Sequence, residues 1–388
     1  MTMATKHEVI KDALEVYLKA TRKEKGVILD RLEKTVHMHR KAIIRRLKVL
    51  QTRRTNFVSD DRGRPTYYTA DVIAGLKDIW DTSNRLCGEL LHPVISEYVG
   101  ILKRDKMWTH SDIATGKLLA MSEMTVKRKV GKFEHTKRKG QGFSSTSPSS
   151  VKTIIPISVG EWKDANPGVL QVDTVAHCGS SLRGDFVYTL NATDVSTFWN
   201  TLRAQWNKGQ EATRVSEEYV REHLPFPFIR RHTDTGSEFV NYHAVEWGCD
   251  NKVSLTRSRP YKKNDNPNVE ERNGHIVRKY VGYIRLDCKE TVPILNDLFK
   301  VLNLYTNHFI PSRKTIENVR VGARYKRTYE KARTPYQRVM NHPNISEETK
   351  NKLRLEHNEL NPAKLLQKIE KLRTKLYDIQ RKHGGPQI

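Results

Sequence analysis

Cysteine is scarce in this 388-residue sequence, and its copies are far apart. They form no C-x-x-C pair, so the sequence offers no obvious zinc site and no disulfide framework. The positions are Cys87, Cys178, Cys249 and Cys288. We therefore expect reduced thiols in or near a core, as is usual in the cytoplasm.

Long apolar runs are also missing. No stretch reaches the roughly 18 consecutive apolar residues that suggest a membrane span. The segment Met1–Lys6 leads into charged, helix-like sequence without the apolar region of a signal peptide. A membrane-surface protein would need a basic amphipathic helix with aromatic residues on one face, and we find none. These absences predict a cytoplasmic protein with no membrane partner.

Positive charge is what the sequence has in excess, +25 in total with a pI of about 9.8. Residues 1–150 hold 30 Lys and Arg against 17 Asp and Glu, and residues 288–388 hold 21 against 10. Residues 151–287, between them, hold 18 against 17. Basic flanks around a balanced centre indicate a polyanionic partner.

The first 60 residues predict a helical DNA-binding unit. Apolar residues recur at helical spacing over residues 6–51, and the segment Thr35–Leu47 has apolar positions that can pack inward. Its outward positions are basic: Arg40, Lys41, Arg45 and Arg46. A short helix, a tight turn and a basic helix are typical of a helix-turn-helix unit. The alternative is a three-helix bundle with a solvated basic face.

A second helical unit is predicted over residues 65–135. Ser122 is a plausible N-cap for another basic helix, whose cations would be Lys127, Arg128 and Lys129. Residues 136–150 combine basic and Ser/Thr/Pro-rich sequence and predict a linker. Two tandem helix-turn-helix units would lengthen the footprint on DNA.

The centre, residues 151–310, changes character. Strand-like apolar runs come first, and helical and strand-like segments then alternate, which predicts a mixed α/β sheet. Asp173 lies inside the strand-like run Leu170–Val175, and Asp234 ends a second such run. Glu270 opens a helix-like segment, with 35 residues between it and Asp234. Converging carboxylates can hold Mg²⁺ against a phosphate, so these three residues predict a metal-dependent enzyme acting on nucleic acid.

The sequences around these carboxylates resemble the integrase core of DDE-type insertion-sequence transposases, which are related to retroviral integrases. The matching stretches are Gln171–Thr174, Thr233–Phe239, Ser258–Asn266 and Asn268–Glu270, and Thr334–Arg338 resembles a late motif of one bacterial transposase group. The resemblance covers about half of the chain. It departs at Thr235, where the family usually has Asn, and no zinc module like that of retroviral integrases precedes the core.

The resemblance implies a multidomain protein with a central ribonuclease-H-like fold. It implies that Asp173, Asp234 and Glu270 bind two Mg²⁺ ions, which Mn²⁺ can replace. The implied reaction is hydrolytic 3′-end cleavage at the element ends followed by strand transfer. The implied partners are the terminal inverted repeats, the target DNA and further copies of the chain, in the bacterial nucleoid.

Several neighbouring residues are weighed against this site. Glu271 is the rival third ligand, and the spacing favours Glu270. Glu238 and the acidic residues Asp185, Asp194 and Asp265 are expected to have structural or surface roles. Nearby cations are expected to hold DNA, with a solvated basic surface as the alternative: Arg259, Lys262, Lys263, Arg278 and Lys279.

The C-terminal region, residues 311–388, is expected to be basic and mostly helical. Its last helix is a candidate for subunit assembly, although Pro362 interrupts the pattern. Two rival functions remain: a domesticated DNA-binding regulator without catalysis, and a ribonuclease-H-like nuclease that cleaves without joining. The intact triad argues against the first, and the helix-turn-helix units argue against the second.

Overall fold

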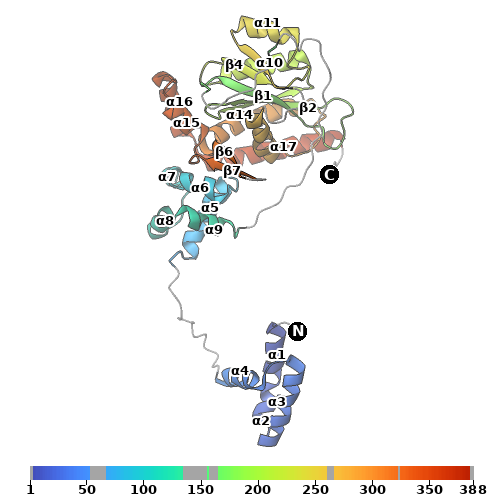
Figure 1. Cartoon of the computed structure of the whole chain (residues 1–388), viewed down its shortest axis with the longest axis vertical. Coiled ribbons are helices and arrows are strands. Elements are labelled where there is room, and N and C mark those ends of the chain that lie inside the picture. Colours follow the sequence, from blue (N-terminus) through green and yellow to red (C-terminus); the bar gives the residue numbers. More distant parts are fainter. Residues whose placement is uncertain are drawn as a thin grey trace. The chain divides into compact units, whose positions relative to one another are not determined.

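The computed structural model describes residues 3–52, 67–133, 155–156, 165–259, 266–321 and 324–384. The chain divides into two compact units, Met1–Tyr67 and Tyr68–Ile388 (Figure 1). Within the described residues, no helix is both long and apolar enough to cross a bilayer.

The first unit consists of the helices α1 (Met3–Asp12), α2 (Leu14–Lys19), α3 (Arg22–Val36) and α4 (Arg40–Thr52). Its core is a small apolar cluster that includes Ile10, Leu32 and Ile43. A capping box between Thr21 and Glu24 starts α3, and His37, with a positive φ of 49°, ends it. The order of helix, short turn and basic helix is the one predicted, and its role on DNA stays a prediction.

Residues 68–133 form the short helices α5 (Ala70–Thr82), α6 (Gly88–Leu91), α7 (Ile95–Arg104), α8 (Asp112–Leu119) and α9 (Glu123–Val130). These helices share one hydrophobic core with the central sheet and the long helices α14 (Thr291–Phe309) and α17 (Pro362–Gly384). Two tyrosines join the parts by hydrogen bonds, from Tyr98 Oη to the carbonyl of Phe309 at 3.3 Å and from Tyr305 Oη to the carbonyl of Thr82 at 2.7 Å.

The central sheet has five strands, in the order β3 (Asn200–Trp206), β2 (Val187–Asp194), β1 (Val169–Ala176), β4 (Arg230–Thr233) and β5 (Ser254–Arg257). The first three strands are antiparallel, while β4 and β5 run parallel to β1. The mixed sheet that the sequence predicts is thus confirmed. The second strand-like run, which Asp234 ends, is observed as β4, and the backbone N–H groups of Ile229 and Arg230 both donate to the carbonyl of Gly168 at its start.

Helices cover both faces of the sheet. On one face, α10 (Gln210–His223) and α11 (Tyr242–Asp250) pack against apolar residues of β1 and β2. The other face is covered by α14 and by a helical stretch made of α12 (Pro267–Arg272), the π-helix Asn273–Arg278 and α13 (Lys279–Val281). The helix-like segment that Glu270 opens in the sequence ends at Gly282, which has a φ of +88°.

The outer edge of β3 is covered by amide side chains from α14. Asn307 pairs in both directions with the backbone of Asn200, at 2.8 Å each way. Asn296 does the same for Ala204, at 2.8 and 3.1 Å, and Asn303 for Leu202, at 3.2 and 3.5 Å. A sheet edge exposes unpaired N–H and C=O groups, and here three asparagines satisfy them.

The C-terminal region contains one element that the prediction of a basic, mostly helical region does not include. The segment Arg313–Arg333 contains the antiparallel hairpin β6 (Thr315–Val321) and β7 (Arg324–Tyr329). The helices α15 (Pro335–Asn341), α16 (Glu347–Glu359) and α17 follow. The apolar face of α17 packs on α14 within the same chain, with Ile369 and Leu376 fully buried. A role of this last helix in subunit assembly stays a prediction.

Candidate active site

Asp173 lies on β1, on the face of the sheet that α12 covers. Successive side chains of a strand point to opposite faces, and the preceding Val172 is buried among α10 and α11. The Asp173 carboxylate accepts hydrogen bonds from the backbone N–H of Thr174 at 2.8 Å and from Asn273 Nδ2 at 2.7 Å. The second bond ties the strand to the π-helix that continues α12.

Asp234 directly follows β4. Because β1 and β4 are parallel, the register that pairs Val172 with Thr233 brings Asp234 beside Asp173 one residue later. Asp234 Oδ1 accepts a 2.9 Å hydrogen bond from the backbone N–H of Gly236. A Cβ at position 236 would lie 3.0 Å from that same oxygen. The glycine therefore allows the backbone to close beneath the carboxylate.

Glu270 lies in the first turn of α12, and the sheet holds that turn in place. The side-chain oxygen of Gln171 accepts hydrogen bonds from the backbone N–H groups of Asn268 at 2.9 Å and Val269 at 3.3 Å. The first N–H groups of a helix have no partner within it, so Gln171 supplies one. Gln171 is two residues before Asp173 and therefore on the same face of β1.

The carboxylates interact electrostatically. The pKa of Asp173 is raised from 3.8 to about 7, first by burial and then by the negative charge of Asp234, with a smaller contribution from Glu270. The backbone of Thr174 and the amide of Asn273 act in the opposite direction by donating hydrogen bonds to the ionised form. The fold thus brings carboxylates together at a buried position, where ionisation of Asp173 is unfavourable.

The two neighbouring glutamates of α12 separate in the structure. The negative charge of Glu270 contributes to the raised pKa of Asp173, whereas the negative charge of Glu271 acts on the pKa of the Arg272 guanidinium. Adjacent residues of a helix point about 100° apart. This geometry is consistent with the preference for Glu270, whose assignment as a metal ligand stays a prediction.

The donor set fits a hard divalent cation. Carboxylate oxygens are the ligands that Mg²⁺ prefers, and a cation would offset the repulsion that raises the pKa of Asp173. As the side chains lie, however, they do not surround an ion. No three His, Cys, Asp or Glu residues are placed to hold a metal together within the part of the chain that the structure describes.

Over 330 residues the chain is 34% identical to the "Uncharacterized protein y4rM" of Sinorhizobium fredii (strain NBRC 101917 / NGR234). The match covers 85% of this chain and 93% of that protein. The chain belongs to the y4rM family. No protein-family model matches it.

Among solved structures, the catalytic core domain of BIV integrase is similar to part of this member of the y4rM family. The likeness has a TM-score of 0.29 and 13% sequence identity, and it covers 44% of this chain and 93% of that one.

Acidic residues near the triad have structural partners. Asp194 is buried and accepts hydrogen bonds from the backbone N–H groups of Gly168 at 2.8 Å and Thr197 at 2.6 Å, which fixes the turn after β2. Glu238 accepts one from Thr174 Oγ1 at 3.2 Å, and burial raises its pKa. Asp185 is exposed, and Asp265 lies outside the described residues.

The predicted DNA-contacting cations of the first unit lie on α4. Lys41 and Arg45 are exposed, whereas Arg40 and Arg46 are half-buried. Arg40 forms an ion pair with Asp30 of α3. The two exposed side chains are therefore the more accessible part of this basic helix.

The cations of α9 differ in the same way. Arg128 is exposed and Lys129 is half-buried. Lys127 forms a 2.5 Å ion pair with Glu89. Arg128 is thus the member of this group with the most open surroundings.

The cations predicted near the carboxylates have several environments. Arg278 donates to the carbonyl of Ala176 at 2.8 Å, and Lys279 donates to the carbonyl of Asn84 at 2.8 Å, so both join the helical stretch to its neighbours. Arg259 is exposed just after β5. Lys262 and Lys263 lie outside the described residues.

Two residues that position the site are not predicted from the sequence. Gln171 stands within a matching stretch, but its bond to α12 depends on which helix packs against β1. Asn273 lies three residues after Glu270, on the same side of a helix, and that spacing could have pointed to it. Asn273 Oδ1 in turn accepts a 2.6 Å hydrogen bond from Asn191 Nδ2 of β2.

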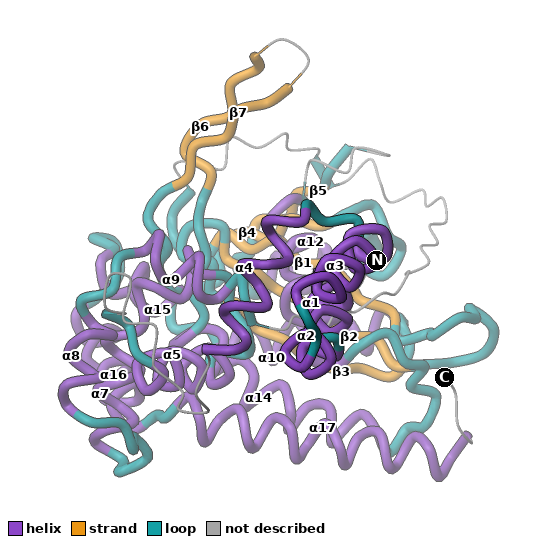
Figure 2. Tube along the Cα trace, turned by 90° about the horizontal axis from the view of Figure 1, so that it is seen from below, coloured by secondary structure: helices purple, strands orange, loops and turns teal. Residues whose placement is uncertain are grey.

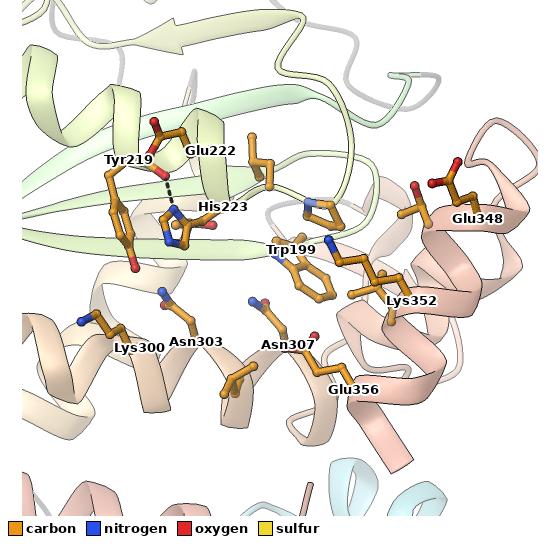
Figure 3. A pocket seen from close by; sticks show the side chains of 16 residues that line it. Trp199, Tyr219, Glu222, His223, Lys300, Asn303, Asn307, Glu348, Lys352 and Glu356 are labelled. Atoms are coloured by element: carbon orange, nitrogen blue, oxygen red, sulfur yellow. Dashed lines mark hydrogen bonds between the residues drawn. The ribbon is translucent and has the colours of Figure 1, made fainter. Parts of the chain in front are cut away.

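A cavity of about 750 Å³ lies elsewhere in this unit, among β3, α10, α14 and α16. Figure 3 shows Tyr219 and His223 at one end, with their hydrogen bond between His223 Nδ1 and the Tyr219 carbonyl, and Glu348 and Lys352 at the other. None of the three carboxylates lines it. The carboxylate site is therefore distinct from this cavity.

Proposed function

We propose that the chain is a DNA transposase with a ribonuclease-H-like core, and that Asp173, Asp234 and Glu270 are its catalytic metal ligands. One observation carries the proposal: β1, the end of β4 and α12 bring these three carboxylates close enough that two of them raise the pKa of the third. A buried carboxylate whose pKa is raised by neighbouring charges is typical of a functional site.

The proposed reaction is phosphoryl transfer at DNA. Water attacks a phosphodiester at the element end, a P–O bond forms, the P–O3′ bond breaks, and the freed O3′ takes a proton. That 3′-hydroxyl then attacks a target phosphodiester and displaces the target's own O3′. Two divalent cations, when bound by the triad, would supply the charge stabilisation that such displacements need.

The remaining residues of the site orient these ligands. Asn273 holds one oxygen of Asp173, and Gln171 seats the first turn of α12, which carries Glu270. Partners of this kind are important for the affinity and geometry of metal sites. We assign DNA contacts to the exposed cations of α4 and α9, and to Arg259 just after β5.

The test is strand transfer by the purified full chain with Mg²⁺ or Mn²⁺ and a labelled duplex carrying the inverted repeat that flanks its gene. Asp173→Asn, Asp234→Asn and Glu270→Gln should each abolish cleavage and joining while duplex binding stays within about twofold. Glu271→Gln is the matched control, since it removes a neighbouring charge from the same helix, and it should remain active.

Each contrary outcome has a meaning. Joining at the wild-type rate by any triad variant would remove the site assignment. Cleavage without joining would favour a nuclease. Sequence-specific binding to the repeat, without cleavage under any metal condition, would favour a DNA-binding regulator.

A further inference from the structure

The β6–β7 hairpin stands away from the body of its unit. Figure 2 shows it extending beyond the helices and the central sheet. Along both strands, every side chain that the structure describes is exposed, from Thr315 to Tyr329. An isolated two-stranded hairpin is only marginally stable in water, so this ribbon has no core of its own.

The hairpin and its base are strongly basic. Residues 313–333 contain eight Lys and Arg against two Glu. The strand register places Arg320 and Arg327 on one face of the ribbon and Lys326 on the other, because Arg320 pairs with Tyr325, Asn318 with Arg327 and Val319 with Lys326. Exposed cations on both faces would meet a polyanion from either side.

The base of the hairpin is held firmly. Ser312 and Arg333 exchange backbone hydrogen bonds of 2.9 and 3.1 Å just before β6 and after β7. The buried Arg338 of α15 donates to the carbonyl of Ser312 at 2.8 Å, to that of Arg333 at 2.9 Å and to Glu330 at 2.5 Å. The late motif Thr334–Arg338 thus has a structural role, because it closes the hairpin's base.

The same base is joined to the helix that carries Glu270. Arg272, two residues further along α12 and buried, donates a 2.9 Å hydrogen bond to Ser312 Oγ. The guanidinium groups of Arg272 and Arg338 and the ammonium group of Lys314 all lie 5.0 Å from the centre of the Phe198 ring. Cation–π contacts in a buried setting stabilise such an arrangement. The base of the β6–β7 hairpin is therefore held in a fixed position relative to α12.

We infer that the β6–β7 hairpin is an arm that grips the backbone of duplex DNA and keeps it in register with the carboxylate site. The major groove admits a two-stranded ribbon, and β-ribbons are a known means of binding DNA. Its charge complements phosphate. The link to the carboxylates rests on the proposed function, whereas the binding of duplex by the arm does not.

The experiment measures binding of a random-sequence duplex to the full chain by fluorescence anisotropy over a range of salt concentrations. The variant is Arg320→Ala/Lys326→Ala/Arg327→Ala. The control, Lys368→Ala/Lys371→Ala/Lys375→Ala, removes the same charge from exposed positions of α17. Circular dichroism checks that both remain folded. Duplex binding needs no catalysis. A chain that fails in strand transfer, but whose duplex binding still depends on the hairpin, would support this inference and contradict the proposed function.

We expect the hairpin variant to bind at least about tenfold more weakly at low salt. The slope of log K against log salt should fall in magnitude by about 2 to 3, since each phosphate that a protein neutralises contributes roughly 0.9 to that slope. The control should change by less than about twofold. Equal weakening in both variants or unchanged binding by the hairpin variant would each overturn the inference.

Discussion

Asn273 and Asp173 are joined by a 2.7 Å hydrogen bond, with the amide of Asn273 as donor and Asp173 Oδ2 as acceptor. Asn191 on β2 extends this network by donating to Asn273 Oδ1 at 2.6 Å. The orientation of the Asp173 carboxylate is therefore set from two elements at once, and the proposed catalytic site has a supporting layer.

Removing that support should slow the chemistry more than the binding. Asn273→Ala leaves Asp173 without its side-chain donor, and we expect strand transfer to fall about 10- to 100-fold, the usual cost of removing a partner of a metal ligand. Asn273→Asp should be worse, because it adds a fourth negative charge. Single-turnover rates and duplex affinity measured side by side would check this. Wild-type rates in Asn273→Ala would show that the bond is structural only.

The raised pKa of Asp173 predicts a stability that depends on pH. Between its unfolded value of 3.8 and its folded value of about 7, the folded chain keeps a proton that the unfolded chain has released. Stability should therefore fall as pH rises through this range and level off above it. In EDTA, Asp173→Asn should exceed the wild type at pH 8 by on the order of 1–3 kcal/mol, and by little at pH 4.

Urea denaturation of both proteins at pH 4, 6 and 8 would test the dependence. Adding Mg²⁺ at pH 8 should stabilise the wild type and leave Asp173→Asn almost unchanged, since a ligand that binds only the folded state raises its stability. A constant difference between the two proteins across pH would contradict the electrostatic account.

Gln171→Met should loosen the first turn of α12. The substitution keeps the volume but removes the oxygen that accepts from the N–H groups of Asn268 and Val269. Leaving buried donors unsatisfied costs about 1–3 kcal/mol, so the free energy of unfolding should fall by that order. Because Glu270 is carried by this turn, activity should also require more Mg²⁺. If the Mg²⁺ concentration needed for activity does not change, the hydrogen bonds of Gln171 stabilise α12 without setting the position of Glu270.

Ser312→Ala should uncouple the hairpin from α12. The substitution removes the hydroxyl that accepts from Arg272, at 2.9 Å, and from Arg338, at 3.2 Å, while the backbone bonds at the hairpin base remain. We expect duplex affinity within about twofold of the wild type and strand transfer reduced severalfold, a split that anisotropy and product assays together would detect. Ser312→Thr keeps the hydroxyl and should recover most of the activity.

The sequence predicts the mixed sheet and the kinds of element that carry the three carboxylates, for identifiable reasons. Asp173 stands in an apolar, strand-like run, and Asp234 directly follows a second one. The β6–β7 hairpin escapes prediction because its described side chains are exposed on both faces, so the strands lack the alternation of apolar and polar residues that marks a half-buried strand.

The packing of α17 escapes prediction for a different reason. Leu365, Ile369 and Leu376 predict an apolar helix face, but sequence alone does not say whether a second chain or α14 covers it. The roles of Gln171 and Asn273 likewise depend on packing between segments far apart in the chain. Such contacts leave only weak local patterns.

The asparagines of α14 limit how copies of this chain can join. An open strand is the usual docking point for another molecule's strand, and at β3 that position is taken by Asn296, Asn303 and Asn307. Each amide offers a donor and an acceptor to one residue, as a neighbouring strand would. Copies of this chain therefore cannot join by extending the sheet at β3 without first displacing α14.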